Sequence, residues 1–174
     1  MEYAVPDGRK YRRAVPNDSL YGQQWYLQAT QPASINAEGA WNLSTGSDSV
    51  VVAVLDTGVR PDHPDLASKF VSAGSGVYGY DFVTDVAVAN DGDGRDADPS
   101  DPGDFISAAD AAGETFNGCT VSGSSWHGTV VSGIVGAASN NSAGVAGVSW
   151  GARILPVRVL GKCFGYDSDI LAGM

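Results

Sequence analysis

Short apolar runs alternate with polar, glycine-rich stretches along this chain. Residues 49–55 form a continuous β-branched run bounded by turn residues, which predicts a central parallel strand covered on both faces. Residues 78–82 and 153–160 predict two further strands. Alternating strands and helices predict an α/β layered fold with a central parallel sheet, in which reactive groups collect at the carboxyl ends of the strands.

Three segments have the sequence pattern of helices. Residues 34–43 predict a helix that Ser34 caps, with Ile35 and Trp41 on its buried side. Residues 167–172 open another helix with a Ser or Asp cap. Residues 127–138 predict a buried helix, because apolar residues recur on one face at positions Val130, Val131, Ile134, Val135 and Ala138.

The composition limits the partners of the protein. The chain has 174 residues, which fits one domain, and a formal net charge of −10. This charge argues against binding nucleic acid or an anionic membrane, because both require a basic surface. No apolar run reaches the roughly 18 residues that a membrane span needs. Nine Asp and one Arg lie between Asp81 and Asp110, so this window supplies eight of the ten net negative charges.

The acidic window predicts a calcium site. Its glycine-spaced carboxylates could converge on one ion, because Ca²⁺ takes six to eight oxygens in flexible geometry. A solvated acidic loop is the alternative, although carboxylates this close repel one another without a cation. The expected ligands are the side chains of Asp91, Asp93, Asp96 and Asp98 with the carbonyl of Arg95, followed by Asp101 and Asp104.

Two residues suggest acid–base chemistry. Asp56 ends the run at 49–55, and His127 lies in the first turn of a predicted helix. Taken singly, Asp56 could merely start a turn and His127 could be a packed core residue. Taken together, they suggest a base and the acid that orients it.

Two long motifs make a family resemblance specific. Residues 52–59 with 63–66 resemble the Asp motif of the subtilisin-like serine proteases, and residues 127–133 resemble their His motif. The segments 144–148 and 154–160 also match, so the resemblance covers the chain from about Pro16 onward. It implies a three-layer subtilisin-like α/β fold that is incomplete in this chain. Residues 15–174 would form the N-terminal part of the catalytic domain.

The resemblance also implies a reaction. Asp56 would orient His127, which would take a proton from a serine hydroxyl during cleavage of polypeptide substrates. The family order is Asp, His, Ser, yet no Gly-Thr-Ser-Met-Ala type motif follows His127. The nucleophilic Ser and the oxyanion Asn are therefore expected beyond Met174, in a C-terminal half that would act as a partner. This chain alone is expected to be inactive.

The family suggests a second calcium site and a zymogen. The implied calcium ligands are Asp18, Asp65 and Asn141, with carbonyls of Ser139, Ala143 and Val145. Residues 1–14 resemble the end of an inhibitory prodomain, cleaved near Ala14 or Val15, with a disordered arm as the alternative.

Secretion is also expected, although residues 1–7 do not resemble a signal peptide. Cys119 and Cys163 could form a disulfide in an exported protein or remain two thiols.

The sequence is also compatible with two other functions. One is a noncatalytic calcium-binding or complementing fragment that has kept the scaffold. The other is an aspartic protease that uses Asp56, Thr57 and Gly58, since aspartic proteases also carry Asp-Thr-Gly after an apolar strand. That second alternative leaves His127 and the acidic window without a role.

Overall fold

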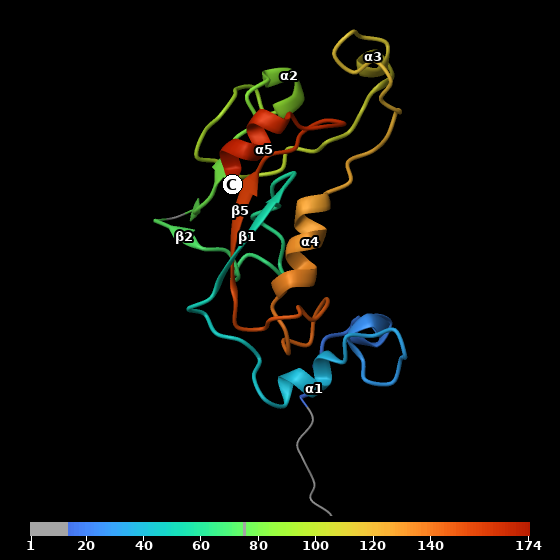
Figure 1. Cartoon of the computed structure of the whole chain (residues 1–174), viewed down its shortest axis with the longest axis vertical. Coiled ribbons are helices and arrows are strands. Elements are labelled where there is room, and N and C mark those ends of the chain that lie inside the picture. Colours follow the sequence, from blue (N-terminus) through green and yellow to red (C-terminus); the bar gives the residue numbers. More distant parts are fainter. Residues whose placement is uncertain (1–13, 75) are drawn as a thin grey trace, which may run out of the picture.

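A computed structural model describes residues 14–74 and 76–174 (Figure 1). Nearly all of the predicted prodomain end or arm, residues 1–14, lies outside the described residues. The described part is built around a parallel sheet with helices packed beside it, which is the predicted α/β architecture. None of its helices combines the length and the apolarity that crossing a membrane requires.

The main sheet has three parallel strands in the order β1-β5-β4. Strand β1 (Val51–Asp56) pairs with β5 (Arg153–Arg158), and β5 pairs with β4 (Tyr80–Asp81). The prediction that β1 is covered on both faces is wrong for the described residues, where β1 is an edge strand and Val51 is 51% exposed. The register places Asp56 beside Arg158 at the carboxyl ends of β1 and β5.

Helix α4 (His127–Gly136) packs on β1 and β5 (Figure 1). The predicted buried face is wrong in part, because Val130 and Ile134 are 55% and 45% exposed. The residues of α4 that are buried are small or polar, namely Gly128, Thr129, Ser132, Gly133 and Gly136. Small residues let the helix backbone approach the sheet closely, while Val131 and Val135 pack against the core beneath the helix.

The other helices differ from expectation at their caps. Helix α1 (Ala37–Trp41) is capped by Asn36, whose Oδ1 accepts the Gly39 N–H, and not by Ser34. Ile35, predicted to be buried, is 62% exposed. Helix α5 (Asp167–Gly173) begins after Tyr166 and has no side-chain cap, so the predicted Ser or Asp cap is wrong.

The remaining elements are short. They are the 3₁₀ turns η1 (Tyr21–Gln23) and η2 (Trp25–Leu27), the hairpin of β2 (Ser72–Ala73) and β3 (Gly76–Val77), and helices α2 (Val86–Ala89) and α3 (Ala108–Ala111).

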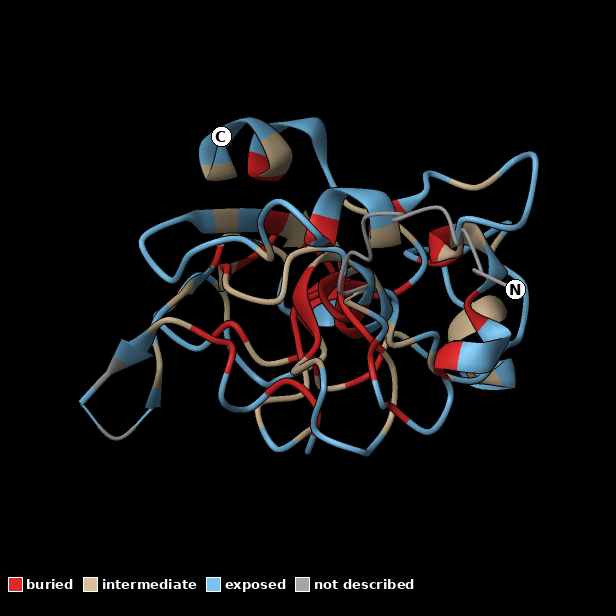
Figure 2. Cartoon of the chain, turned by 90° about the horizontal axis from the view of Figure 1, so that it is seen from below, coloured by how far each residue is buried: buried red, intermediate tan, exposed pale blue. Residues whose placement is uncertain are grey.

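The buried residues gather at the centre of the molecule (Figure 2). The cluster beneath α4 joins the sheet to the segment that follows β1, and consists of Val54, Val59, Leu66, Phe70 and Ile154. A second cluster lies under α2 and the segment 105–116, and consists of Val83, Val88, Ala89, Ile106 and Phe116. The turn after β1 is thereby fixed on a packed core.

A disulfide joins the segment before the His motif to the loop after β5. Cys119 and Cys163 are bonded, with their Cα atoms 6.1 Å apart. The bond ties the segment that carries α3 to the loop between β5 and α5. Of the two alternatives that the sequence leaves open, the structure has the disulfide.

The disulfide predicts a large stability loss on its removal. The bonded residues are 44 positions apart, and a loop of that size corresponds to about 3 to 4 kcal/mol in the chain-entropy model. We expect the double variant C119S/C163S to lose about 3 kcal/mol in free energy of unfolding, measured by urea titration. Reduced and alkylated wild-type protein should lose a similar amount. An unchanged midpoint in both samples would contradict this prediction.

Candidate active site

Asp56 and His127 form a hydrogen-bonded pair at the edge of the sheet. His127 is the first residue of α4, and its Nδ1 lies 2.8 Å from both Oδ1 and Oδ2 of Asp56. The backbone N–H of Thr57 donates to Asp56 Oδ1 at 2.7 Å. The Asp56 residue is only 6% exposed, whereas the His127 side chain is 61% exposed. A buried carboxylate thus orients an imidazole that solvent or a substrate can reach.

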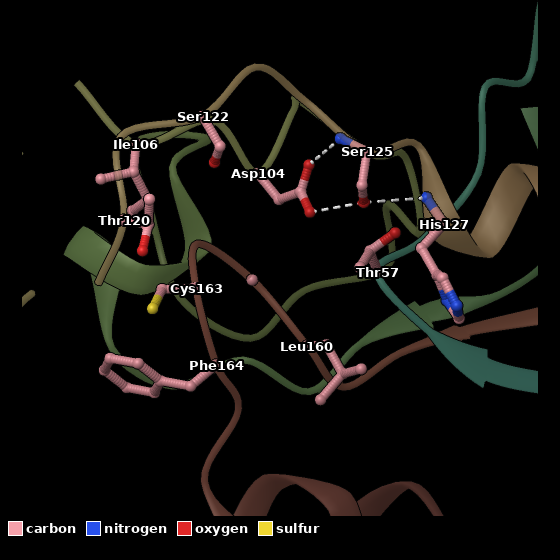
Figure 3. Close-up of a pocket in the computed structure, with 11 residues that line it drawn as sticks. Thr57, Asp104, Ile106, Thr120, Ser122, Ser125, His127, Leu160, Cys163 and Phe164 are labelled. Atoms are coloured by element: carbon pink, nitrogen blue, oxygen red, sulfur yellow. Dashed lines mark hydrogen bonds between the residues drawn. The ribbon is translucent and has the colours of Figure 1, made fainter. Parts of the chain in front are cut away.

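A cleft lies next to His127 (Figure 3). Its volume is about 360 Å³. Its walls come from the end of β1, from the segment 104–125 and from the loop after β5, and include Thr57, Asp104, Ile106, Ser125, Leu160 and Phe164. The disulfide partner Cys163 also contributes, so the disulfide shapes one wall of the cleft.

Thr57, Asp101, Asp104 and Ser125 lie around the Asp56–His127 pair, and none of them is predicted from the sequence to take part in a serine-protease reaction. Thr57 Oγ1 donates to Asp101 Oδ2 at 2.8 Å, and burial raises the pKa of Asp101 above its ordinary value. Asp104 accepts two hydrogen bonds from Ser125, as Figure 3 shows. The one sequence signal for these residues is the Asp-rich segment before the His motif, which predicts a calcium site.

Within the described residues, three Asp side chains of the acidic window form ion pairs: Asp81 and Asp91 with Arg158, and Asp110 with Lys162. Asp96 and Asp98 accept the backbone N–H groups of Asp98 and Ser100, and Asp91 also accepts that of Asp93. Arg95 donates to Asp169 from α5, outside the window. Among residues 14–74 and 76–174, no three His, Cys, Asp or Glu side chains are grouped to hold a metal.

The residues of the second predicted calcium site lie around one loop. Asp18 Oδ2 accepts the Asn140 N–H at 2.7 Å, and Asp65 Oδ1 accepts from the Asn141 side chain at 2.8 Å. Asp65 Oδ2 also accepts the Val145 N–H at 2.9 Å. Both carboxylates are 5% exposed. Ser139 and Ala143 belong to the same loop, in which Ala143 donates its N–H to Asn141 Oδ1.

The chain is similar to proteins that are named as extracellular proteases. It is 42% identical over its whole length to the extracellular basic protease of Dichelobacter nodosus, of which it covers 27%. It is 46% identical over 90% of its length to the extracellular protease of Xanthomonas campestris pv. campestris, of which it covers 25%. The chain therefore spans about a quarter of the length of these curated relatives.

A solved structure and a family model agree with these relatives. A protease from Pseudoalteromonas arctica is 48% identical, with a TM-score of 0.76, over 91% of this chain and 42% of that one. Residues 47–174 match the model of the subtilase family. That match includes both Asp56 and His127. The chain therefore belongs to the subtilase family, and its sheet and helices are part of a subtilisin-like α/β fold.

Proposed function

We propose that this chain supplies the Asp and His of a serine-type endopeptidase that cleaves polypeptides. The observation that carries the proposal is the contact of His127 Nδ1 with both carboxylate oxygens of Asp56. Membership in the subtilase family supports the same reaction.

The geometry assigns a role to each residue of the pair. Asp56 accepts the Nδ1–H of His127, which leaves Nε2 as the nitrogen that can take a proton. Nε2 takes the proton of a serine hydroxyl as its oxygen attacks the scissile carbonyl, and the buried Asp56 stabilises the resulting imidazolium. The imidazolium then gives that proton to the departing amine, and water hydrolyses the acyl-enzyme by the same steps.

The nucleophile is proposed to come from a part of the protein outside this chain. In the described residues, His127 Nε2 makes no hydrogen bond to a serine hydroxyl. The second candidate function is a noncatalytic or complementing module. The aspartic protease alternative is disfavoured, because Asp56 is paired with His127 and not with a second carboxylate.

Labelling of the full-length gene product tests the proposal. A serine-directed fluorophosphonate should label the wild-type protein and not its His127→Ala variant, and the label should abolish peptide hydrolysis. A folded full-length protein that neither takes the label nor cleaves a peptide would favour the noncatalytic module. Hydrolysis that survives the label but stops with pepstatin would favour the aspartic mechanism.

We also propose that the protein is secreted and made as a zymogen. The extracellular relatives and the disulfide support secretion. The proposed inhibitor is the protein's own prodomain, which would end near Ala14.

We further propose that calcium stabilises the protein. The arrangement that fits calcium better is the loop site, where buried Asp18 and Asp65 lie at one loop whose carbonyls supply the oxygen ligands that Ca²⁺ prefers. The acidic window fits less well, because Asp93 and Asp98 are exposed and Asp91 is already paired with Arg158.

Calcium removal should lower the thermal midpoint of the protein. At a free Ca²⁺ concentration of about one hundred times Kd, binding contributes about 2.7 kcal/mol, which corresponds to a shift of roughly 5–10 °C. Melts with Ca²⁺ and with EGTA measure the shift. The variant D18N should lose most of the response, whereas D93N in the acidic window should keep it. A response lost in D93N and kept in D18N would move the site to the acidic window.

A further inference from the structure

The chain joins helix α4 through a strained residue. Trp126, which immediately precedes His127, has φ 53° and ψ 35°, in the left-handed region that bulky side chains rarely adopt. Such a conformation persists only where the surroundings enforce it, and it is concentrated at functional sites. The contacts of its two neighbours show what enforces it.

Asp104 holds the two residues that flank Trp126 in the chain, Ser125 directly and His127 through the Ser125 hydroxyl. Its Oδ1 accepts the Ser125 N–H and its Oδ2 accepts the Ser125 hydroxyl, each at 2.6 Å. The Ser125 Oγ in turn accepts the N–H of His127 at 3.2 Å (Figure 3). One carboxylate therefore fixes the residue before Trp126 directly and the residue after it through one hydroxyl.

Asp101 binds the same helical turn through Thr57. The Thr57 hydroxyl oxygen accepts the Gly128 N–H at 3.0 Å, and its proton is donated to Asp101 Oδ2. An ionised carboxylate can only accept, so Asp101 fixes the direction of this hydrogen bond. The other oxygen, Asp101 Oδ1, accepts the Gly103 N–H at 2.8 Å. Asp101, Thr57 and Gly128 are all buried.

Gly128 packs directly on the turn that carries Asp56. A Cβ atom at this position would lie 2.1 Å from the Gly58 carbonyl oxygen and 3.1 Å from the Asp56 Cβ. The distance between the imidazole and Asp56 therefore depends on how this first helical turn is seated. Asp101 and Asp104 lie three residues apart on one loop. Asp101 fixes the position of this turn through Thr57 and Gly128, and Asp104 fixes it through Ser125 and His127.

We propose that Asp101 and Asp104 are positioning residues, which act through Thr57 and Ser125 to hold His127 against Asp56. The inference rests on the proposed peptidase function for its kinetic consequences, but not for its structural ones. Neither carboxylate is assigned a step in the chemistry.

Kinetics of the full-length gene product give the first test. T57V and D104A should each lower kcat about 10-fold to 100-fold, because a displacement of about 1 Å in a catalytic group can cost that much. KM should stay within about threefold, since the substrate contacts are unchanged. T57S keeps the hydroxyl and should keep kcat within about threefold of wild type.

Two matched variants separate positioning from a general loss of stability. T84V removes a hydroxyl that donates to Asp169 Oδ1 at 2.7 Å, and D85A removes a carboxylate that caps α2 through two backbone N–H groups. Both should lower the thermal midpoint about as much as T57V and D104A, with kcat within about twofold of wild type. Loss of kcat in these controls to the same extent would overturn the inference.

The imidazole proton of His127 gives a readout that needs no turnover. With isotope-labelled histidine, the wild-type protein should show a low-field Nδ1 proton, identified by its absence in H127A. The resonance should broaden or disappear in T57V and D104A but remain in T57S, T84V and D85A. If it is unchanged in folded T57V and D104A, the positioning role is wrong. If wild type shows this pattern without peptidase activity, only the proposed function fails.

Discussion

Replacing Asp56 with Asn is expected to lower kcat of the full-length protein about ten-thousand-fold while the fold stays intact. The carboxylate accepts the Nδ1–H of His127 with both oxygens at 2.8 Å and also accepts the Thr57 N–H. An amide would place an N–H₂ group against one of these donors and favour the tautomer with its proton on Nε2. That nitrogen could then no longer act as the base.

Single-turnover and steady-state hydrolysis of a peptide substrate measure this effect. The double variant D56N/H127A should be no slower than H127A alone, because the two residues act as a unit. D48N provides the control, since Asp48 is exposed and lies in the turn before β1. A loss of less than about tenfold in D56N would show that Asp56 does not orient the base.

The site residues that the sequence could predict are those whose position follows from strand geometry. Residues 49–55 form one apolar run, so the end of β1 had to present Asp56, and the His motif began a helix as expected. Both motifs are local patterns of about eight residues. Their meeting across 71 positions depends on topology, which the family resemblance supplied and periodicity alone could not.

The packing of α4 shows why the burial of its side chains could not be predicted from the sequence. Apolar periodicity indicated Val130 and Ile134 as core residues, but close packing on the sheet selects the face with Gly128 and Gly136. A hydrophobic pattern reports the width of an apolar stripe and not the distance between helix and sheet. The left-handed Trp126 is likewise invisible in a sequence, because tryptophan carries no preference for that conformation.

The charges of the acidic window could be counted from the sequence, but their partners could not. Asp91 is neutralised by Arg158, which lies 67 positions away on β5. Arg95, which the sequence suggested as a carbonyl ligand, extends its guanidinium to Asp169 in α5. Such long-range ion pairs leave no periodic signal in the sequence. The calcium prediction therefore takes no account of these arginine partners.

Arg158 is the most deeply buried cation of this region. It is 1% exposed, its Nη1 donates to the fully buried Asp81 and to Asp91, and its Nη2 donates to the Ala89 carbonyl. Burial raises the pKa of Asp81 to about 7, while Arg158 opposes the rise. Since Arg158 pairs in register with Asp56 and Asp81, this ion cluster lies at the same end of the sheet as Asp56.

Replacing Arg158 with Met is expected to destabilise the protein by about 3 to 5 kcal/mol, because it leaves Asp81 buried without a counter-charge. Asp81 would then remain protonated in the folded state well above its unfolded pKa of 3.8, so folded stability falls as pH rises. The deficit in free energy of unfolding, measured by urea titration, should therefore be larger at pH 8 than at pH 6. The double variant D81N/R158M should recover at least half of the loss at pH 8, since no unpaired buried charge is left at position 81. If R158M is as stable as wild type at pH 8, Asp81 does not depend on Arg158, and the ion cluster does not stabilise the end of the sheet that carries Asp56.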